Sequence, residues 1–329
     1  MAINILDIIN TRAIKLKSIE VDDIFFATGG GATNAAATFG NQGLRTAVIC
    51  KIGSDPGGEA AIKEIKERFG IDVKFIQKGK DKATAYAIIL RCGEGKKGDR
   101  IILVHRGVSE YLEFSNIPLD KCLKTKWLYL APLGGENFKL FEPIVNEAVK
   151  RGVKIAVDPS KDQIKMGLDK LKPILKNIDI LKLNREEGSY LTGVDVKNIF
   201  GIAKAISGMV KSLAVVTDGP NGLVACDRES FYQAGVYPEK TYADRTGAGD
   251  AFGSGFVSSL ILDEKNPSTS SGQQVGTTCW DIERAIKFGT ANATAVVEEL
   301  GAKNGLLMKG DFEKDERWKN LEIKKTKAS

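Results

Sequence analysis

The sequence of 329 residues contains a single histidine, His105, and five cysteines, none of which are spaced as Cys-x-x-Cys. A serine-protease triad and a multi-histidine metal centre are therefore nearly excluded, and reduced thiols are expected in place of a disulfide framework or a zinc site. The chain also lacks long apolar runs, and its N-terminus lacks the features of a signal peptide. We therefore expect a cytoplasmic protein with no membrane partner.

Two familiar nucleotide-binding patterns are missing as well. No GxxxxGK[ST] loop occurs, and no GxGxxG follows the first expected strand. The second absence argues against a nucleotide-dependent oxidoreductase. The net charge of +6 is spread along the chain, with a local excess of lysine at residues 319–327, and no basic stripe with interleaved aromatics occurs elsewhere. We therefore expect no nucleic-acid partner.

Short apolar runs alternate with amphipathic helical patterns from residue 124 onward. Strands are expected at residues 127–131, 153–157, 178–183 and 212–217, and a helix at residues 137–151. This alternation predicts an α/β fold with a mostly parallel central sheet and helices on both faces. In such sheets ligands bind beyond the carboxyl ends of the strands, so the polar residues that end these runs are site candidates.

The first third of the chain has a different pattern. Short strands are expected at residues 11–16 and 21–26, and a β-hairpin at residues 84–91 and 100–104, with helices starting at residue 31 and spanning residues 55–69. We interpret segments 8–27 and 83–106 as a small β-sheet lid on a single domain of residues 1–329, and expect the lid to form a homodimer contact. The polar run at residues 263–279 indicates a flexible loop.

The most informative segment is the sequence DRTGAGDAF at residues 244–252, which precedes an apolar helical pattern. Gly247 and Gly249 allow a tight turn and a close approach to a ligand. The helix that follows would direct its free N–H groups and its positive dipole end at an anion. Asp250, in the first helical turn, could accept the proton of an attacking hydroxyl group during phosphoryl transfer. By itself, the pattern also fits an ordinary turn with a helix-capping aspartate.

This segment resembles the C-terminal signature of the PfkB (ribokinase-like) carbohydrate kinase family. Other family motifs occur in the same order: GGxxxN at residues 29–34, KIGSD at 51–55, NxxE at 184–187 and a TxG turn at 217–222. The resemblance covers residues 7–305. It implies a ribokinase-like three-layer sandwich and an ATP-dependent kinase that transfers the γ-phosphoryl group to a sugar hydroxyl, with Mg²⁺ as a cofactor.

The resemblance also implies roles for individual residues. Asp250 would be the catalytic base, and the anion hole would consist of Gly247, Ala248 and Gly249. The sugar would be bound by Asp7, Gly29, Gly30 and Asn34. ATP would be bound by Asn184, Thr217, Gly219, Gly222 and Asn292. Glu187 would act on Mg²⁺ through water. A monovalent cation, K⁺, would be bound by Asp244, Thr246, Val296, Glu299 and Gly301.

Several alternatives stay open at this point. Asn184 also fits a helix cap, and Arg106, which follows the hairpin, fits either a surface arginine or a contact to an acidic group of the substrate. Position 31 is glycine where ribokinases tend to have lysine, which argues against a strict ribose assignment. A nucleoside or a sugar phosphate is the alternative substrate. A catalytically silent sugar- or nucleotide-binding regulatory protein is the alternative of a different class. The intact turn before Asp250 argues against it, because a binding protein needs no base.

Overall fold

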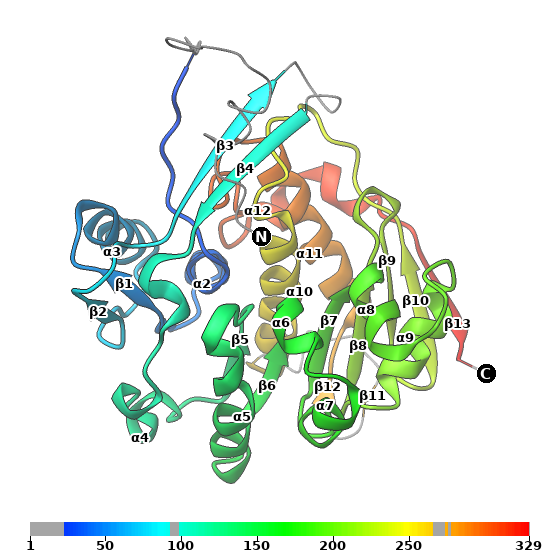
Figure 1. Ribbon diagram of the computed structural model, residues 1–329. Coiled ribbons are helices and arrows are strands. Elements are labelled where there is room, and N and C mark those ends of the chain that lie inside the picture. The colour runs from blue at the N-terminus through cyan, green and yellow to red at the C-terminus, as the bar shows by residue number, and fades with distance from the viewer. Residues whose placement is uncertain (1–22, 93–98, 266–273, 276–277, 329) are drawn as a thin grey trace, which may run out of the picture.

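The computed structural model describes residues 23–92, 99–265, 274–275 and 278–328. Its centre is a seven-stranded sheet with the strand order β13-β10-β9-β8-β7-β6-β5 (Figure 1). The parallel strands are β5 (Trp127–Leu130), β6 (Lys154–Val157), β7 (Ile180–Asn184) and β8 (Leu213–Thr217). Antiparallel pairing adds β9 (Leu223–Cys226), β10 (Ser230–Ala234) and β13 (Ile323–Lys327). Because β10 is antiparallel to β9, it runs in the same direction as β5 to β8.

Helices cover both faces of this sheet, because successive residues of each inner strand face opposite sides. In β6, Ile155 packs into one hydrophobic cluster and Ala156 into the other. The first face is covered by α5 (Phe141–Lys150), α7 (Leu168–Leu175), α8 (Arg185–Thr192) and α9 (Ile199–Ser207). The second is covered by α2 (Gly31–Asn41), α10 (Ala248–Lys265) and α11 (Ile282–Val297). The predicted α/β class with helices on both faces is confirmed.

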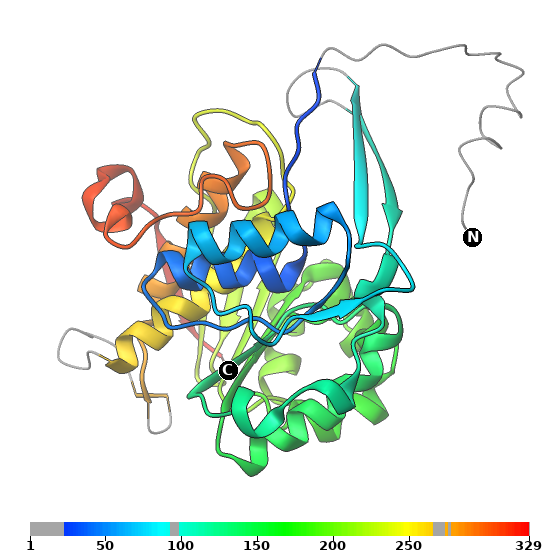
Figure 2. The same ribbon diagram turned by 90° about the vertical axis from the view of Figure 1, so that its left-hand side faces the viewer.

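The expected β-hairpin is present and projects away from the main sheet (Figures 1 and 2). It consists of β3 (Tyr86–Cys92) and β4 (Asp99–His105), which pair in antiparallel register. The strand expected at residues 11–16 lies outside the described residues. The strand expected at residues 21–26 is wrong for residues 23–26, which form no strand, and their apolar side chains Ile24, Phe25 and Phe26 are exposed. Strand propensity alone does not form a strand without a pairing partner.

Two helix predictions are confirmed near the N-terminal end of the described chain. One is α2. The other is α3 (Pro56–Phe69), whose N-cap Asp55 accepts a hydrogen bond from the Gly58 amide at 2.9 Å and which ends at Gly70 in the left-handed conformation. Next to α3, β1 (Lys51–Gly53) pairs in parallel with β2 (Gln77–Gly79).

Two other boundaries differ from the prediction. The helix expected from residue 137 begins as a 3₁₀ turn, η4 (Gly135–Leu140), before α5. Helix α10 continues to Lys265, so the first residues of the expected polar loop are helical. The remaining short elements are η2 (Gly107–Glu110), η3 (Phe114–Asn116), α4 (Leu119–Cys122), α6 (Lys161–Ile164), η5 (Gly219–Asn221), β11 (Gln274–Val275), β12 (Thr278–Cys279), α12 (Asp311–Lys314) and η7 (Glu316–Lys319). None of the helices in the described ranges is both long and apolar enough to cross a bilayer.

Candidate active site

The glycine-rich turn leads directly into α10, as the sequence predicts. Gly247 has a φ of 84°, and a Cβ atom there would lie 2.6 Å from the Cβ of Ala302, so this position requires glycine. Because α10 begins at Ala248, the amides of Gly249 and Asp250 belong to the first helical turn, whose N–H groups have no carbonyl before them in the helix. Gly249 is exposed and Asp250 is half-buried. The turn is therefore open to an anionic ligand.

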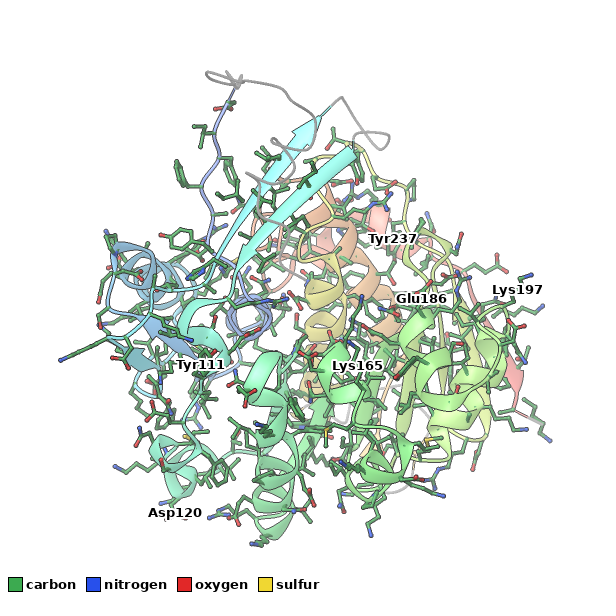
Figure 3. All side chains as sticks on the ribbon, in the orientation of Figure 1. Tyr111, Asp120, Lys165, Glu186, Lys197 and Tyr237 are labelled. Atoms are coloured by element: carbon green, nitrogen blue, oxygen red, sulfur yellow. The ribbon has the colours of Figure 1, made fainter. Side chains whose placement is uncertain are left out.

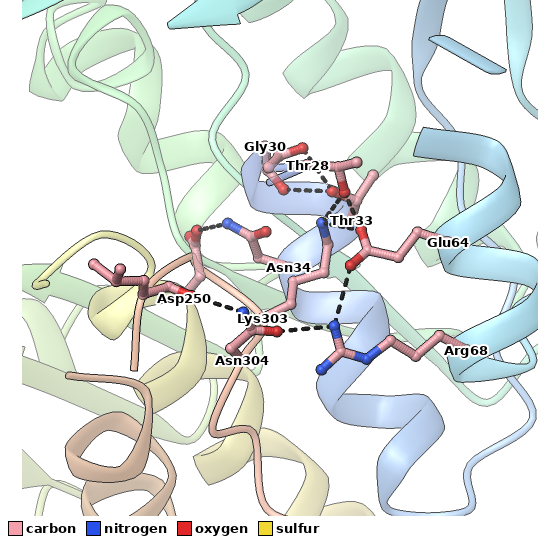
Figure 4. Close-up of polar contacts among 11 residues, drawn as sticks. Thr28, Gly30, Thr33, Asn34, Glu64, Arg68, Asp250, Lys303 and Asn304 are labelled. Carbon is pink, nitrogen blue, oxygen red and sulfur yellow. Dashed lines mark hydrogen bonds and ion pairs between the residues drawn. The ribbon is translucent and has the colours of Figure 1, made fainter. Parts of the chain in front are cut away.

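The side chain of Asp250 contacts the predicted sugar-binding motif. The Asn34 side-chain amide, on α2, donates a hydrogen bond from Nδ2 to Oδ2 of Asp250 at 2.8 Å (Figure 4). Asn34 is 4% exposed, and its Oδ1 is buried without a hydrogen-bond partner among the described residues. The exposed Gly30 forms the N-cap of α2 with a φ of 101°. Two motifs separated by more than 200 residues thus meet at the carboxylate of Asp250.

The glycine at position 31 has a physical explanation in this contact. A Cβ atom on Gly31 would lie 2.9 Å from Cδ of Pro132 and 3.4 Å from Oδ1 of Asp250. A longer side chain would therefore displace either the proline or the carboxylate. The lysine that ribokinases carry here does not fit next to Pro132 without such a shift.

A lysine that the sequence analysis did not single out lies on the other side of the turn. The Nζ atom of Lys182, on β7, is 3.4 Å from the place that a Cβ on Gly249 would take. It forms an ion pair of 2.8 Å with Oδ2 of Asp158, which follows β6. Behind them, the hydroxyl group of Tyr129 on β5 is buried without a hydrogen-bond partner in the described part of the chain. A cation held by a buried carboxylate therefore lies beside the first turn of α10.

Burial and neighbouring charges set the protonation of this group. Burial raises the pKa of Asp158 to about 6, although the ammonium of Lys182 opposes this rise. Burial acts to lower the pKa of Lys182, but the carboxylates of Asp158, Asp250 and Glu187 outweigh it, so that the pKa is raised overall. Lys182 is therefore a cation at neutral pH. Burial also raises the pKa of Tyr129 well above its usual value, with Asp158 and Asp250 adding to the rise, and this keeps the phenol neutral.

The NxxE and TxG motifs end two adjacent parallel strands. Asn184 is the last residue of β7 and pairs in register with Thr217, the last residue of β8. Asn184 and Glu187 form a capping box on α8. Oδ1 of Asn184 accepts from the amide of Glu187 at 2.8 Å, and Oε2 of Glu187 accepts from the amide of Asn184 at 3.0 Å. The neighbouring Glu186 lies on the outside of α8 (Figure 3). The helix-cap role of Asn184 is thus present in the structure.

The turn after β8 is shaped by two glycines with positive φ. Gly219 has a φ of 53° and is exposed, and Gly222 has a φ of 94°. A Cβ on Gly222 would collide with the carbonyl oxygen of Ala234. The exposed part of the turn is therefore residues 219–221, at the carboxyl edge of the sheet where α/β folds bind ligands, whereas Gly222 is buried against Ala234.

The family model of the pfkB family carbohydrate kinases matches residues 3–308. The chain belongs to this family. It is 27% identical over 267 residues to an uncharacterized sugar kinase of Archaeoglobus fulgidus, covering 80% of this chain and 96% of the relative. It is 28% identical over 291 residues to a ribokinase of Haemophilus influenzae, covering 85% and 84%. A solved ribokinase of Arabidopsis thaliana, complexed with ribose and ATP, has a TM-score of 0.71 at 19% identity, covering 92% and 91%, and therefore shares the fold.

Of the residues predicted for the site of this carbohydrate kinase, two have partners elsewhere in the fold and a third lies outside the described residues. Asn292 is fully buried; its Nδ2 donates to the carbonyl of Ala251 at 2.9 Å and its Oδ1 accepts from the amide of Leu307 at 3.0 Å. Its side-chain amide is therefore engaged in the core beside α10, and its contact to ATP stays a prediction. Arg106 is exposed and pairs with Glu110 at 3.5 Å, on the outside of the hairpin base. Asp7 lies outside the described residues.

The residues predicted to bind a monovalent cation come from two loops that contact one another. The amide of Asp244 donates to the carbonyl of Val297 at 3.2 Å, and Oδ1 of Asp244 accepts from the amide of Thr246 at 3.2 Å. The carbonyl of Val296 accepts from the amide of Glu299 at 3.2 Å. Gly301 has a φ of 92° at the end of the second loop. The structure thus brings the two halves of this set together beside the turn.

The raised pKa of Asp158 predicts a pH dependence of the kinase's stability. Asp158 binds a proton more tightly in the folded chain than in the unfolded chain, whose aspartates titrate near pH ~4. Protonation therefore favours the folded state below that pH, and this contribution is lost as the pH rises through about 6. We expect the free energy of unfolding, relative to that of Asp158→Asn, to fall between about pH 4 and 6 and to stay level above about pH 7. Urea unfolding of both proteins at several pH values measures this; a pH-independent difference would contradict the raised pKa.

Proposed function

We propose that this kinase transfers the γ-phosphoryl group of ATP to a hydroxyl group of a sugar, with Asp250 as the catalytic base. The observation that carries the proposal is the 2.8 Å hydrogen bond between Asn34 and Asp250. It places the GGxxxN motif, which offers exposed backbone and an amide for sugar hydroxyl groups, directly against a carboxylate at the start of a helix. A base next to an acceptor loop and an anion-binding turn is the set of groups that phosphoryl transfer to an alcohol needs.

The reaction follows from the positions of these groups. A sugar hydroxyl bound by Gly29, Gly30 and Asn34 faces Asp250, whose carboxylate takes the proton as the oxygen attacks phosphorus. The new O–P bond forms as the bond between the γ-phosphorus and the bridging oxygen breaks, and ADP leaves with the bond's electrons. The amides of Gly247 and Gly249 and the ammonium of Lys182 face the charge on the transferred group, while the amide of Ala248 donates to the carbonyl of Arg245 at 3.1 Å.

The nucleotide binds on the sheet side of the turn in this proposal. Its phosphates and ribose lie along the carboxyl ends of β7 and β8, near Asn184, Thr217, Gly219 and Gly222. Glu187 would hold an ATP-bound Mg²⁺ through water, since magnesium keeps several of its waters, and the ion would supply positive charge against the phosphates. A monovalent cation between residues 244–246 and 296–301 would fix the turn from behind.

The hairpin is the part that we propose as a lid and a dimer contact. Apolar side chains are exposed on both of its strands: Tyr86, Ile88, Leu90, Ile101, Ile102 and Val104. A two-stranded hairpin with exposed apolar faces is marginally stable alone and gains stability when another surface covers it. Closure over the acceptor would exclude water from the phosphoryl group, and a second copy of the chain could cover the outer face.

The test is an ADP-release assay with pentoses, hexoses, sugar phosphates and nucleosides, each with ATP and Mg²⁺ and with or without K⁺. We expect release that depends on a sugar. Release with nucleosides only would reassign the acceptor class within the same chemistry. Binding of sugar and ATP without any ADP release would overturn the proposal in favour of a silent binding protein.

A further inference from the structure

A second connection joins the acceptor loop, residues 28–30 before α2, to the segment after α11. Lys303, in the segment after α11, is 2% exposed. Its ammonium donates a hydrogen bond to Oγ1 of Thr28 at 2.5 Å and pairs with Oε2 of Glu64, on α3, at 3.2 Å. The hydroxyl group of Thr28 in turn donates to Glu64. In Figure 4, Lys303 extends toward Thr28 and Glu64, and each of these three side chains contacts the other two.

The two ends of this set belong to opposite parts of the active site. Thr28 immediately precedes Gly29 and Gly30, the exposed glycines of the acceptor loop. The residue before Lys303 is Ala302, which is buried and fills the space beside Gly247 where no side chain fits. Lys303 therefore links the acceptor loop to the segment that supports the anion-binding turn. Asn34 and Asp250 make the other link between the same two parts.

A partly exposed arginine, Arg68, also contacts Glu64. Nη1 of Arg68 is 3.2 Å from Oε1 of Glu64 and donates to Oδ1 of Asn304 at 2.9 Å. The carboxylate of Glu64 therefore faces the hydroxyl of Thr28 and two cations, and Asn304 fixes the chain next to Lys303. Burial holds the pKa of Lys303 below its usual value, although Glu64 and Asp250 act in the opposite direction.

The energetics of buried charges indicate that Lys303, Glu64 and Thr28 fix the geometry of the site more than they stabilise the fold. Lysine is almost never fully buried in folded proteins unless it is paired. A buried ion pair adds little net stability, because desolvation of both charges offsets their attraction, and apolar residues of the same volume often serve as well. The charged set instead fixes the geometry, since the ammonium and the hydroxyl each have two partners and the carboxylate has three. Since Thr28 directly precedes the two glycines of the acceptor loop, a fixed Thr28 also limits the positions that the loop can take.

We propose that Lys303 is a positioning residue for the phosphoryl acceptor: together with Glu64 it holds Thr28, and thereby glycines 29 and 30, at the distance from Asp250 that in-line transfer requires. The inference rests on the proposed function, because it assigns that loop to the acceptor. Lys303 is too buried to contact the acceptor itself. Its effect passes through Thr28.

The decisive variants are Thr28→Val and Thr28→Ser. Valine has the shape of threonine and leaves the buried Lys303–Glu64 ion pair in place, but it removes the hydroxyl group that ties the loop to the pair. We expect the KM for the acceptor to rise about tenfold, equivalent to about 1.4 kcal/mol, with the KM for ATP within about twofold of wild type. Serine keeps the hydroxyl group and is expected to restore the wild-type KM.

Lys303→Met removes the ammonium and is expected to show the same split between the two substrates. Arg284→Met is the matched control, because it removes a cation that pairs with Asp263 at 3.4 Å and Glu313 at 2.6 Å, away from the acceptor loop. If Lys303→Met does not fold, Thr28→Val alone decides. A Thr28→Val protein with lower stability and an unchanged KM for the acceptor would overturn the proposal, since the set would then be only structural. So would a Lys303→Met effect confined to acidic acceptors, since Lys303 would then be a substrate contact.

Amide hydrogen exchange of the ligand-free protein tests the link without turnover. The amide of Asn34 donates to the carbonyl of Gly30 at 2.9 Å, so its exchange rate reports on the start of α2. We expect exchange at residues 29–34 to be at least about tenfold faster in Thr28→Val and Lys303→Met, and unchanged in Thr28→Ser and Arg284→Met. Equal exchange in all five proteins, wild type included, would overturn the link. If wild type phosphorylates no acceptor, the proposed function fails, and the exchange result still decides whether Lys303 fixes the loop.

Discussion

Asp250→Asn is expected to lower kcat by about 10²–10⁴-fold, the range typical of a lost general base, while the Kd for ATP stays within about twofold of wild type. Asparagine has nearly the same shape, and its Oδ1 can still accept the hydrogen bond that Asn34 donates at 2.8 Å. The loop geometry is therefore kept and only the proton acceptor is lost. Steady-state ADP release and a calorimetric titration with ATP measure the two quantities.

The matched control for this variant lies on the same helix. Asp263→Asn makes the same change at a buried position of α10 that accepts from the amide of Asp281 at 3.2 Å and pairs with Arg284. It is expected to lower stability and to leave kcat within about threefold of wild type, because Asp263 is about three turns away from the anion-binding turn. Turnover near the wild-type level in Asp250→Asn would remove Asp250 from the role of base.

The main sheet and the turn were predictable because their signals are local. The inner parallel strands β6, β7 and β8 are mostly buried on both faces, which requires short apolar runs that end in polar or turn residues. Gly247 has a backbone conformation and a packing environment that admit glycine only, so its identity marks the turn in the sequence. Because the turn at Gly247 leads directly into α10, Asp250 lies in the first turn of this helix.

The charged groups around the turn could not be predicted, because their partners are distant in sequence. Lys182 occupies one position in an apolar strand, and Asp158 lies 24 residues earlier. They meet because β6 and β7 pair with Val157 opposite Leu181, a register that only the folded sheet defines. Lys303 and Glu64 are separated by 239 residues and belong to segments whose polarity is typical of protein surfaces.

The strand expected at residues 23–26 was predicted wrongly, and Asn292 has a role that the sequence leaves open. A polar residue on an apolar helix is compatible with a ligand site and with a buried structural role, and the sequence does not say which partner its amide meets. In the fold, the partners of Asn292 are Ala251 and Leu307. Residues 23–26 have the composition of a strand, but strand formation depends on a neighbouring strand. Both cases depend on interactions between distant segments that no local pattern contains.

Lys182→Met is expected to have the second largest effect, a fall in kcat of about 10²–10³-fold, the range found when one preorganised group facing transition-state charge is removed. The ammonium lies beside Gly249 and is held there by Asp158 at 2.8 Å, so it needs no rearrangement when negative charge accumulates on the transferred phosphoryl group. Methionine keeps the length and apolar volume of the side chain. Without the cation, the pKa of the remaining Asp158 rises further, because Lys182 is the group that lowers it, so the carboxyl group becomes neutral in place of staying as an unpaired charge.

Lys154→Met is the control for this substitution. Lys154 also lies on a strand of the sheet, β6, and pairs with Glu264 at 2.6 Å, but at the opposite edge from the turn. We expect kcat within about threefold of wild type in this variant, whereas Lys182→Met loses kcat and kcat/KM for ATP together. A higher KM for ATP with unchanged kcat in Lys182→Met would mean that Lys182 binds ground state and transition state equally. Equal losses in the two variants would assign the effect to stability, because the only property they share is a missing ion pair in the sheet.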